Sequence, residues 1–159
     1  MEAHDIEIAR EKASAFLARA VEFCHGAKSL EKTGGQGWIT SCTLLLGYTA
    51  ELIAKKRLLE KGVPEMTLKR SPYGHRIFDM WKSDAELWAE AEELYGRIGE
   101  RGDLTIHLWA LDHFCGGDSD YSIRYSSERA HYPEVIALLP VFLEILHREG
   151  MRRQDWVYI

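Results

Sequence analysis

Apolar side chains recur at three- and four-residue steps along most of the chain, which is the spacing of one face of an α-helix. The first such segment covers residues 6–24 and carries charged residues between its apolar positions. The second covers residues 38–61; it is apolar nearly all round at first and becomes amphipathic after Glu51. We therefore predict two long helices joined by a glycine-rich loop at 33–37, with the second helix the most buried.

Local stop and start signals divide the following region into shorter helices. Gly62 followed by Pro64 predicts the end of the second helix, because glycine accepts a left-handed C-terminal conformation and proline cannot continue the helix. One or two helical turns are expected over residues 77–81. Ser83 and Glu86 have the spacing of a capping box, in which each side chain satisfies a free backbone amide of the other residue. They predict the start of a further helix.

The last third of the chain contains two more helical patterns. Asp103 is a predicted N-cap for a short helix that ends before Gly116. Residues 135–146 form an apolar run that predicts a final core helix, and Pro140 is expected to bend it because proline removes an amide donor and clashes with the preceding turn.

These patterns together indicate the fold class. Strand-period alternation of useful length is missing from the sequence, and so are internal repeats. We predict an all-α, single-domain, up-and-down bundle of about five or six helices over residues 1–150. The apolar tail at 151–159 is expected either to fold back on this bundle or to dock on a second subunit.

Composition and charge narrow the setting but do not name a partner. The chain has 159 residues with 46% hydrophobic content and a formal net charge of −5, which describes an ordinary solvated surface rather than a basic nucleic-acid footprint. Its three cysteines are odd in number and far apart, which favours reduced thiols and a cytoplasmic location. The charged N-terminus and the lack of a long apolar run predict neither a signal peptide nor a membrane span.

Metal and cofactor chemistry receive little support from the motifs. The loop GGQGW at residues 34–38 lacks the lysine and the strand context of a phosphate-binding loop. Several potential metal ligands lie close together in sequence, but they lack the i, i+4 histidine spacing that places two ligands on one helical face; they are His107, Asp112, His113, Cys115 and Asp118. We therefore expect no cofactor and no metal.

Glu51 and Lys55 stand four residues apart on the second predicted helix, in the favourable order for an ion pair. One interpretation is an exposed pair of little energetic consequence. The apolar neighbours of Glu51 favour the other interpretation, in which it faces other helices and needs a buried partner. His75 and Arg124 are the candidates for that partner.

Arg124 and His131 are candidates for a catalytic pair at the entry to the last helix. A histidine near its ordinary pKa can move protons at neutral pH, and an arginine can stabilise a developing phosphoryl charge. Arg101 and His107, with five intervening residues, form a competing pair of the same kind.

Three segments in this order resemble the HEPN superfamily of small helical domains. They are LLLGYTAELIAKKRLLEKG (44–62), YGHRIFDMW (73–81) and IRY (123–125). The resemblance implies a bundle that often dimerises and, in active members, cleaves RNA without a metal through an arginine and a following histidine. Arg124 and His131 would then be catalytic, and the setting would be a toxin–antitoxin or defence system. RNA, an antitoxin or a companion nucleotidyltransferase would be the partner.

The same resemblance supports a rival hypothesis. Tyr125 follows the arginine where active ribonucleases of the family usually carry a small polar residue. In the rival hypothesis Glu51, Lys55, His75, Arg124 and Tyr125 form an internal polar network that locks the bundle. The protein would then be a non-catalytic binding or regulatory module, since one fold can carry both kinds of function.

Overall fold

The computed structural model describes residues 3–34, 38–98, 103–115 and 135–152, and every regular element within these ranges is helical. The all-α class is thus confirmed. The described part contains seven α-helices and one 3-10 turn where five or six helices were predicted. They are α1 (Ala3–Thr33), α2 (Trp38–Glu60), α3 (Glu65–Leu68), α4 (Ile77–Ser83), α5 (Ala85–Ile98), α6 (Leu104–Cys115), the 3-10 turn η2 (Val135–Ala137) and α8 (Leu138–Arg152).

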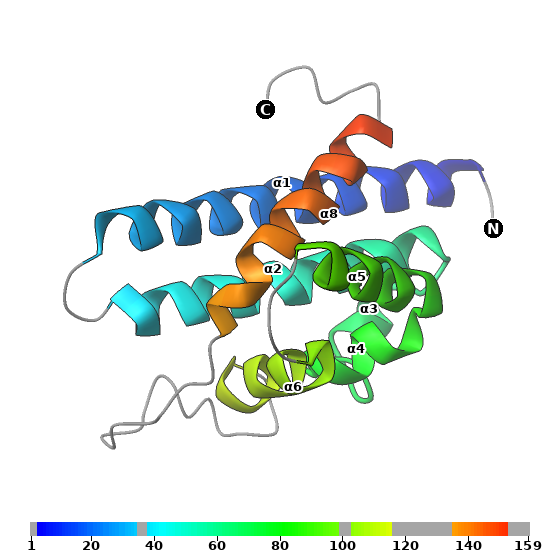
Figure 1. The fold of residues 1–159 in the computed structure, drawn as a ribbon. Coiled ribbons are helices and arrows are strands. Elements are labelled where there is room, and N and C mark those ends of the chain that lie inside the picture. Colours follow the sequence, from blue (N-terminus) through cyan, green and yellow to red (C-terminus); the bar gives the residue numbers. More distant parts are fainter. Residues whose placement is uncertain (1–2, 35–37, 99–102, 116–134, 153–159) are drawn as a thin grey trace.

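Helices α1 and α2 form a long antiparallel pair along one side of the molecule (Figure 1). Helix α1 is longer at both ends than the sequence pattern predicted. Its buried positions are mostly small and follow helical spacing: Ala13, Leu17, Ala20, Cys24 and Ala27. Small side chains on one face let two helix backbones approach closely over many turns, which explains why this pair has the most extensive packing in the fold.

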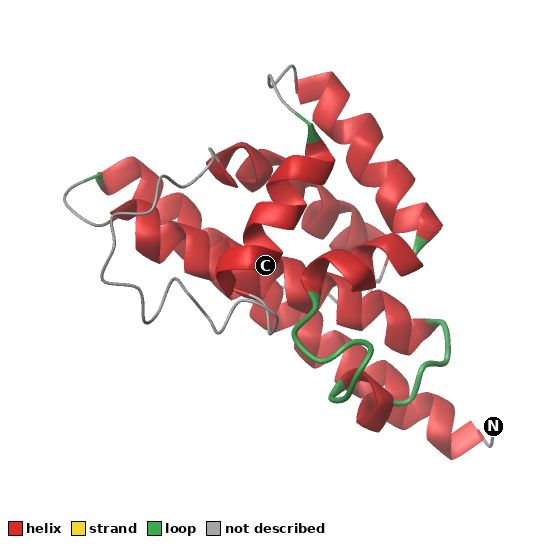
Figure 2. Cartoon of the chain, turned by 90° about the horizontal axis from the view of Figure 1, so that it is seen from below, coloured by secondary structure: helices red, strands yellow, loops and turns green. Residues whose placement is uncertain are grey.

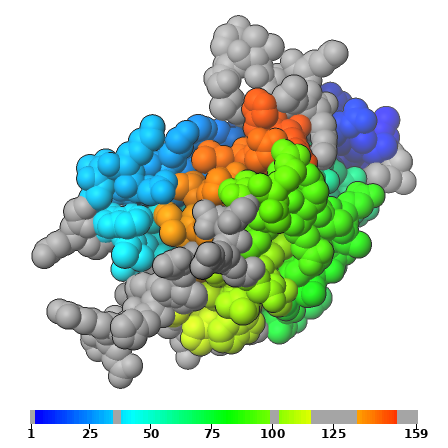
Figure 3. Space-filling model, in the orientation of Figure 1, coloured from blue at the N-terminus to red at the C-terminus, as the bar shows by residue number. Residues whose placement is uncertain are grey.

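Helix α8 crosses the α1–α2 pair, and α5 lies beside it (Figures 1 and 3). Helices α4 and α6 pack together on the other side of the molecule. Seen from below, the described residues form helices joined by loops (Figure 2). Trp81 of α4 is fully buried at the centre, with its ring 5.5 Å from that of Phe142 in α8. Its indole nitrogen donates to the carbonyl of Ala50 at 2.9 Å, so the polar atom of this large core residue is satisfied.

The predicted stop at Gly62 is confirmed. Gly62 has φ +91°, its amide donates to the carbonyl of Leu59, and the amide of Val63 donates to the carbonyl of Leu58. These two bonds form the Schellman motif, which needs a residue in the left-handed region and therefore favours glycine. Pro64 then precedes the short helix α3, which the sequence pattern did not predict.

The predicted capping box of Ser83 and Glu86 is wrong. Helix α4 runs through Ser83, whose hydroxyl donates to the carbonyl of Met80. Asp84 caps α5 instead, because its carboxylate accepts the amide of Leu87 at 3.0 Å. The predicted cap at Asp103 is confirmed by the 2.8 Å bond that its carboxylate accepts from the amide of Thr105.

The last α-helix begins later than predicted, which changes the setting of Pro140. Residues Val135–Ala137 form a 3-10 turn, and α8 begins only at Leu138. Pro140 therefore lies in the first turn of α8, where backbone amides have no partner within the helix and proline costs nothing. The helix continues to Arg152, past the predicted domain boundary at residue 150, and the tail from 153 lies outside the described residues.

A close approach between α2 and the end of α6 depends on Gly47. A methyl group on Gly47 would lie 2.6 Å from both Cβ and Sγ of Cys115, closer than packed atoms allow. The Cys115 thiol donates to the carbonyl of Thr43 at 3.6 Å. This contact fixes the end of α6, after which the segment 116–134 leads to η2.

None of the described helices is long and apolar enough to span a membrane.

Candidate functional site

The predicted catalytic pair lies outside the described residues. Arg124 and His131 belong to the segment 116–134, and so does Tyr125. Of the competing pair, Arg101 is outside the described residues and His107 is within them. Catalysis by either pair stays a prediction.

Glu51, Lys55 and His75 are brought together. Lys55 Nζ lies 2.6 Å from Glu51 Oε1, and His75 Nδ1 lies 3.0 and 3.1 Å from the two carboxylate oxygens of Glu51. Glu51 and Lys55 are only 8% and 9% exposed, whereas the side chain of His75 is 52% exposed. The carboxylate thus lies on α2 between a buried ammonium and an imidazole at the protein surface.

This triad can act in two ways. A carboxylate beside Nδ1 holds the imidazole in one orientation, which is what a general base requires. It also joins the loop before α4 to the middle of α2, and the two partners offset the cost of burying the carboxylate. Within the described residues, no three histidine, cysteine, aspartate or glutamate side chains could hold a metal ion.

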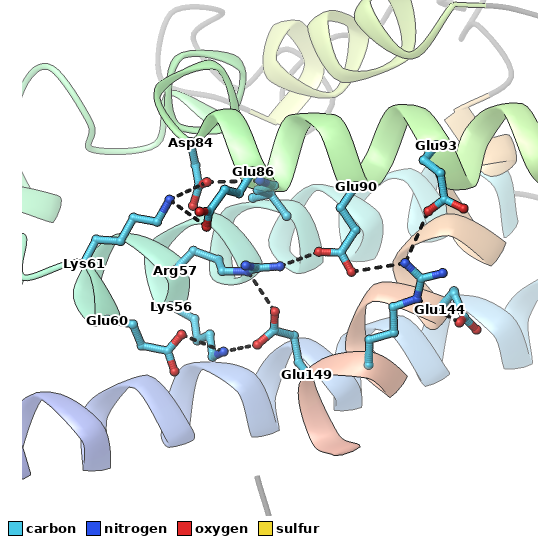
Figure 4. A network of polar contacts seen from close by, with 12 residues as sticks. Lys56, Arg57, Glu60, Lys61, Asp84, Glu86, Glu90, Glu93, Glu144 and Glu149 are labelled. Atoms are coloured by element: carbon cyan, nitrogen blue, oxygen red, sulfur yellow. Dashed lines mark hydrogen bonds and ion pairs between the residues drawn. The ribbon is translucent and has the colours of Figure 1, made fainter. Parts of the chain in front are cut away.

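A larger set of charges, buried at its centre and exposed at its edges, joins α2, α5 and α8, and we call it the ionic cluster (Figure 4). Its centre is Glu149 of α8, which is buried and forms ion pairs with two neighbouring residues of α2. The members are Lys56, Arg57, Glu60, Lys61, Asp84, Glu86, Glu90, Glu93, Glu144, Arg148 and Glu149.

The pairs at the centre are close, and all their members except Glu60 are almost fully buried. Lys56 contacts both Glu149 and Glu60, the latter at 2.8 Å. Arg57 Nη2 lies 2.5 Å from Glu90 Oε2 on α5, and its Nε lies 2.8 Å from Glu149 Oε1. The Nε contact lacks hydrogen-bond alignment, so charge attraction alone holds it. Glu149 therefore links Lys56 and Arg57 of α2 to α8, and Arg57 also links α2 to α5.

The outer part of the ionic cluster is more open. Arg148 of α8 lies 3.1 Å from Glu144, 3.4 Å from Glu93 and 3.5 Å from Glu90. A surface hollow of about 550 Å³ lies beside it, lined by Arg57, Glu86, Ala89, Glu90, Glu93 and Arg148. Each charged side chain that lines the hollow forms an ion pair with a neighbour. The hollow is therefore part of the contact between the helices.

Lys61 and Asp84 close the cluster at the other end, 2.8 Å apart. The hydrogen bond to Asp84 raises the pKa of Lys61. Burial alone would raise the pKa of Asp84, but the hydrogen bonds from Lys61 and from the amide of Leu87 outweigh it and hold that pKa below its ordinary value. Both groups are therefore charged at neutral pH.

Sequence reasoning missed the ionic cluster, although one signal was present. Residues 55–57 are three consecutive cations in a helix, and successive side chains point about 100° apart. They cannot all lie on a narrow solvent-facing stripe, so at least one must turn toward another helix. The glutamate-rich sequence of α5 supplies the opposite charge.

Two of the side chains considered as metal ligands have separate structural roles. His107 Nδ1 lies 2.7 Å from the hydroxyl of Tyr95, and both residues are buried. Asp112 accepts the amide of Ile77 at 2.8 Å and so caps the start of α4. Asp118 lies outside the described residues.

The outer face of α6 exposes apolar side chains. Ile106 and Trp109 are 56% and 55% exposed, one helical turn apart. The ring of His113 stacks on that of Trp109 at a centroid distance of 5.3 Å and an interplanar angle of 9°. We call these three residues the α6 face. Large apolar groups on a surface mark interaction sites when they are grouped in this way.

All three cysteines are free and buried. Burial raises the pKa of Cys24 to about 12 and that of Cys42 to about 11. Both thiols stay protonated at neutral pH, and a protonated thiol is a poor nucleophile. They are core residues of the α1–α2 pair.

In comparisons with known proteins, the sequence matches no family model, no curated protein and no solved structure.

Proposed function

We propose that this chain is a HEPN-like helical binding module without catalytic activity, whose buried charges hold the helices together and whose α6 face contacts a partner protein. The proposal combines the sequence resemblance with the use that the described residues make of their ionisable groups.

The observation that carries it is the pairing of the charged residues. Glu51 is shared by Lys55 and His75, and Glu149 by Lys56 and Arg57. Each of these groups has a particular partner, and removing Glu51 or Glu149 would leave buried cations with fewer partners, so the groups have a structural role. This pattern supports the polar-network hypothesis over one in which Glu51 and His75 are kept for chemistry.

The α6 face supports a protein as the partner. Tryptophan is enriched among residues that dominate protein interfaces, where truncation often costs about 2 kcal/mol or more. A formal net charge of −5 does not favour RNA as the ligand. A second copy of the chain, a nucleotidyltransferase and an antitoxin are the partners to test.

The test measures association with and without the α6 face. Sedimentation velocity is recorded for the purified chain alone and mixed with proteins encoded by adjacent genes. Trp109→Ala is expected to weaken the complex about thirtyfold, corresponding to about 2 kcal/mol. Ile106→Ala should weaken it less, and Ile39→Ala is the matched control because Ile39 is 49% exposed on α2. Equal affinity of the Trp109 and Ile39 variants would contradict the α6 face as the contact.

Ribonuclease activity is tested in parallel on bulk RNA in the presence of a metal chelator. We expect the wild-type chain and His131→Ala to leave the RNA equally intact. Cleavage by the wild-type chain that the His131 variant lacks would overturn the non-catalytic proposal and favour the Arg124–His131 pair.

A further inference from the structure

Two aromatic rings form a corner where α4 meets α5. Phe78 of α4 and Trp88 of α5 have ring centroids 6.0 Å apart and planes at 88° to each other. Both side chains are half-buried, so the corner lies at the protein surface. Two perpendicular rings present two adjacent walls.

The corner holds an ammonium group from the same chain. Lys82 Nζ lies 4.1 Å from the Trp88 ring centroid and 5.7 Å from that of Phe78, both within the range of a cation–π contact. Lys82 is exposed, and it makes no ion pair with any described residue. The ring faces are therefore its chief partners within the described part of the chain.

The local sequence explains this geometry. Phe78 and Lys82 are four residues apart on α4, which places both on one side of that helix. Asp84 then caps α5, and Trp88 follows at the end of the first turn of α5. The position of Trp88 is thus fixed by the cap, whereas Lys82 is a flexible side chain that can leave.

We propose that the corner formed by Phe78 and Trp88 is a binding site for an alkylammonium group, which Lys82 occupies as an internal substitute. The ligand is a lysine side chain of a partner protein, preferably a trimethylated one; this protein source rests on the proposed function. A trimethylammonium group carries the same charge as Lys82 but is less strongly hydrated, so it gains more from the ring faces than Lys82 does.

A nearby carboxylate is consistent with a cationic ligand. Glu92 follows Trp88 by four residues on α5 and is exposed. It forms no ion pair with the described residues, unlike Glu86, Glu90 and Glu93 of the same helix. An incoming cation at Trp88 would lie on the same side of α5 as this charge.

The test uses the full chain and three probes. Tetramethylammonium chloride and two short peptides, identical except for trimethyllysine or norleucine, are titrated while the indole signals are followed by NMR. Trp88→Leu assigns the Trp88 signal and removes one wall. Lys82→Gln empties the site, and Lys32→Gln is its control because Lys32 is another exposed lysine in the last turn of a helix.

We expect Lys82→Gln to bind the trimethyllysine peptide at least about threefold more tightly than the wild-type chain, and Lys32→Gln to bind it as the wild-type chain does. Adding Trp88→Leu or Phe78→Leu to Lys82→Gln should weaken binding by about three- to thirtyfold, the value of one cation–π contact. A thermal melt of each double variant shows that it is folded.

The proposal is overturned if Lys82→Gln binds neither cationic probe saturably, or if the norleucine peptide binds as tightly as the trimethyllysine peptide. If tetramethylammonium binds as tightly as the trimethyllysine peptide, the ammonium site is supported but a protein source of the ligand is rejected. Tetramethylammonium binding does not depend on a protein partner. A finding that the α6 face makes no contact in the association experiments would therefore not change the outcome of this titration.

Discussion

The two halves of α2 are packed by different means, and the second half is the more buried. The first half packs apolar residues such as Cys42 and Leu46 against neighbouring helices. The second half buries Lys55, Lys56 and Arg57 almost as completely. Burial of apolar side chains stabilises a contact roughly in proportion to the apolar area removed from water, and it does not depend on direction. Buried charges require particular partners at particular positions, so the second half fixes where α5 and α8 lie.

The largest loss of stability is expected from a substitution at Glu149. Replacing it with alanine would leave Lys56 and Arg57 buried with one partner fewer each. We expect Glu149→Ala to lower the free energy of unfolding by about 3–5 kcal/mol, measured by urea denaturation. Glu144→Ala is the control, since Glu144 is in a more exposed pair on the same helix and should cost under about 1 kcal/mol.

The next largest effect is expected at Glu51. Glu51→Ala removes the carboxylate that pairs with the buried Lys55 ammonium and with His75. It should lower the free energy of unfolding by an amount on the order of 3 kcal/mol. Glu51→Gln keeps the shape and some hydrogen bonding, so its cost should be smaller. A loss under about 0.5 kcal/mol for the alanine variant would mean that the pair is no more than a surface contact.

A smaller loss is expected in the apolar half of α2, at Gly47. Gly47→Ala would place a methyl group against Cys115 and force the end of α6 outward. The cost of such overpacking is about 1–3 kcal/mol. Gly47→Ala should cost less in a Cys115→Gly chain, which lacks both Cβ and Sγ of Cys115, than in the wild-type chain. An equal cost in the two chains would show that the strain lies elsewhere.

The smallest effect concerns pH and Asp84. Since the pKa of Asp84 is lower in the folded chain, its contribution to stability is present above the unfolded pKa of ~3.9 and is lost as pH falls toward the folded value. Asp84→Asn keeps the cap of α5 but cannot titrate. Its unfolding free energy should therefore fall less steeply than that of the wild-type chain below about pH 4. Parallel curves for the two proteins would contradict the role of the Lys61–Asp84 pair.

Much of the fold followed from local patterns, because helix periodicity and the Gly62 stop depend on neighbours in sequence. The errors arose where a more distant or better-placed group took over a local role. Asp84 caps α5 although Ser83 and Glu86 had the expected spacing. Asp112 caps α4 from another helix, and periodicity cannot show this.

The candidate sites were less predictable for the same reason. The pairing of Glu51 with Lys55 could be anticipated from their spacing of four residues, and His75 was one of two suggested partners. Glu149 was not suggested, because its partners on α2 lie more than ninety positions away in sequence. Only the packing of α8 across α2 brings these charges together.

A double-mutant cycle on Lys56 and Glu149 tests most directly whether buried ion pairs fasten α8 to α2. Urea unfolding is measured for the wild-type chain, Lys56→Met, Glu149→Gln and the double variant. We expect a coupling energy of about 2 kcal/mol or more, with the double variant more stable than the sum of the single losses predicts. A coupling energy under about 0.5 kcal/mol would contradict the account, because the two charges would then contribute independently.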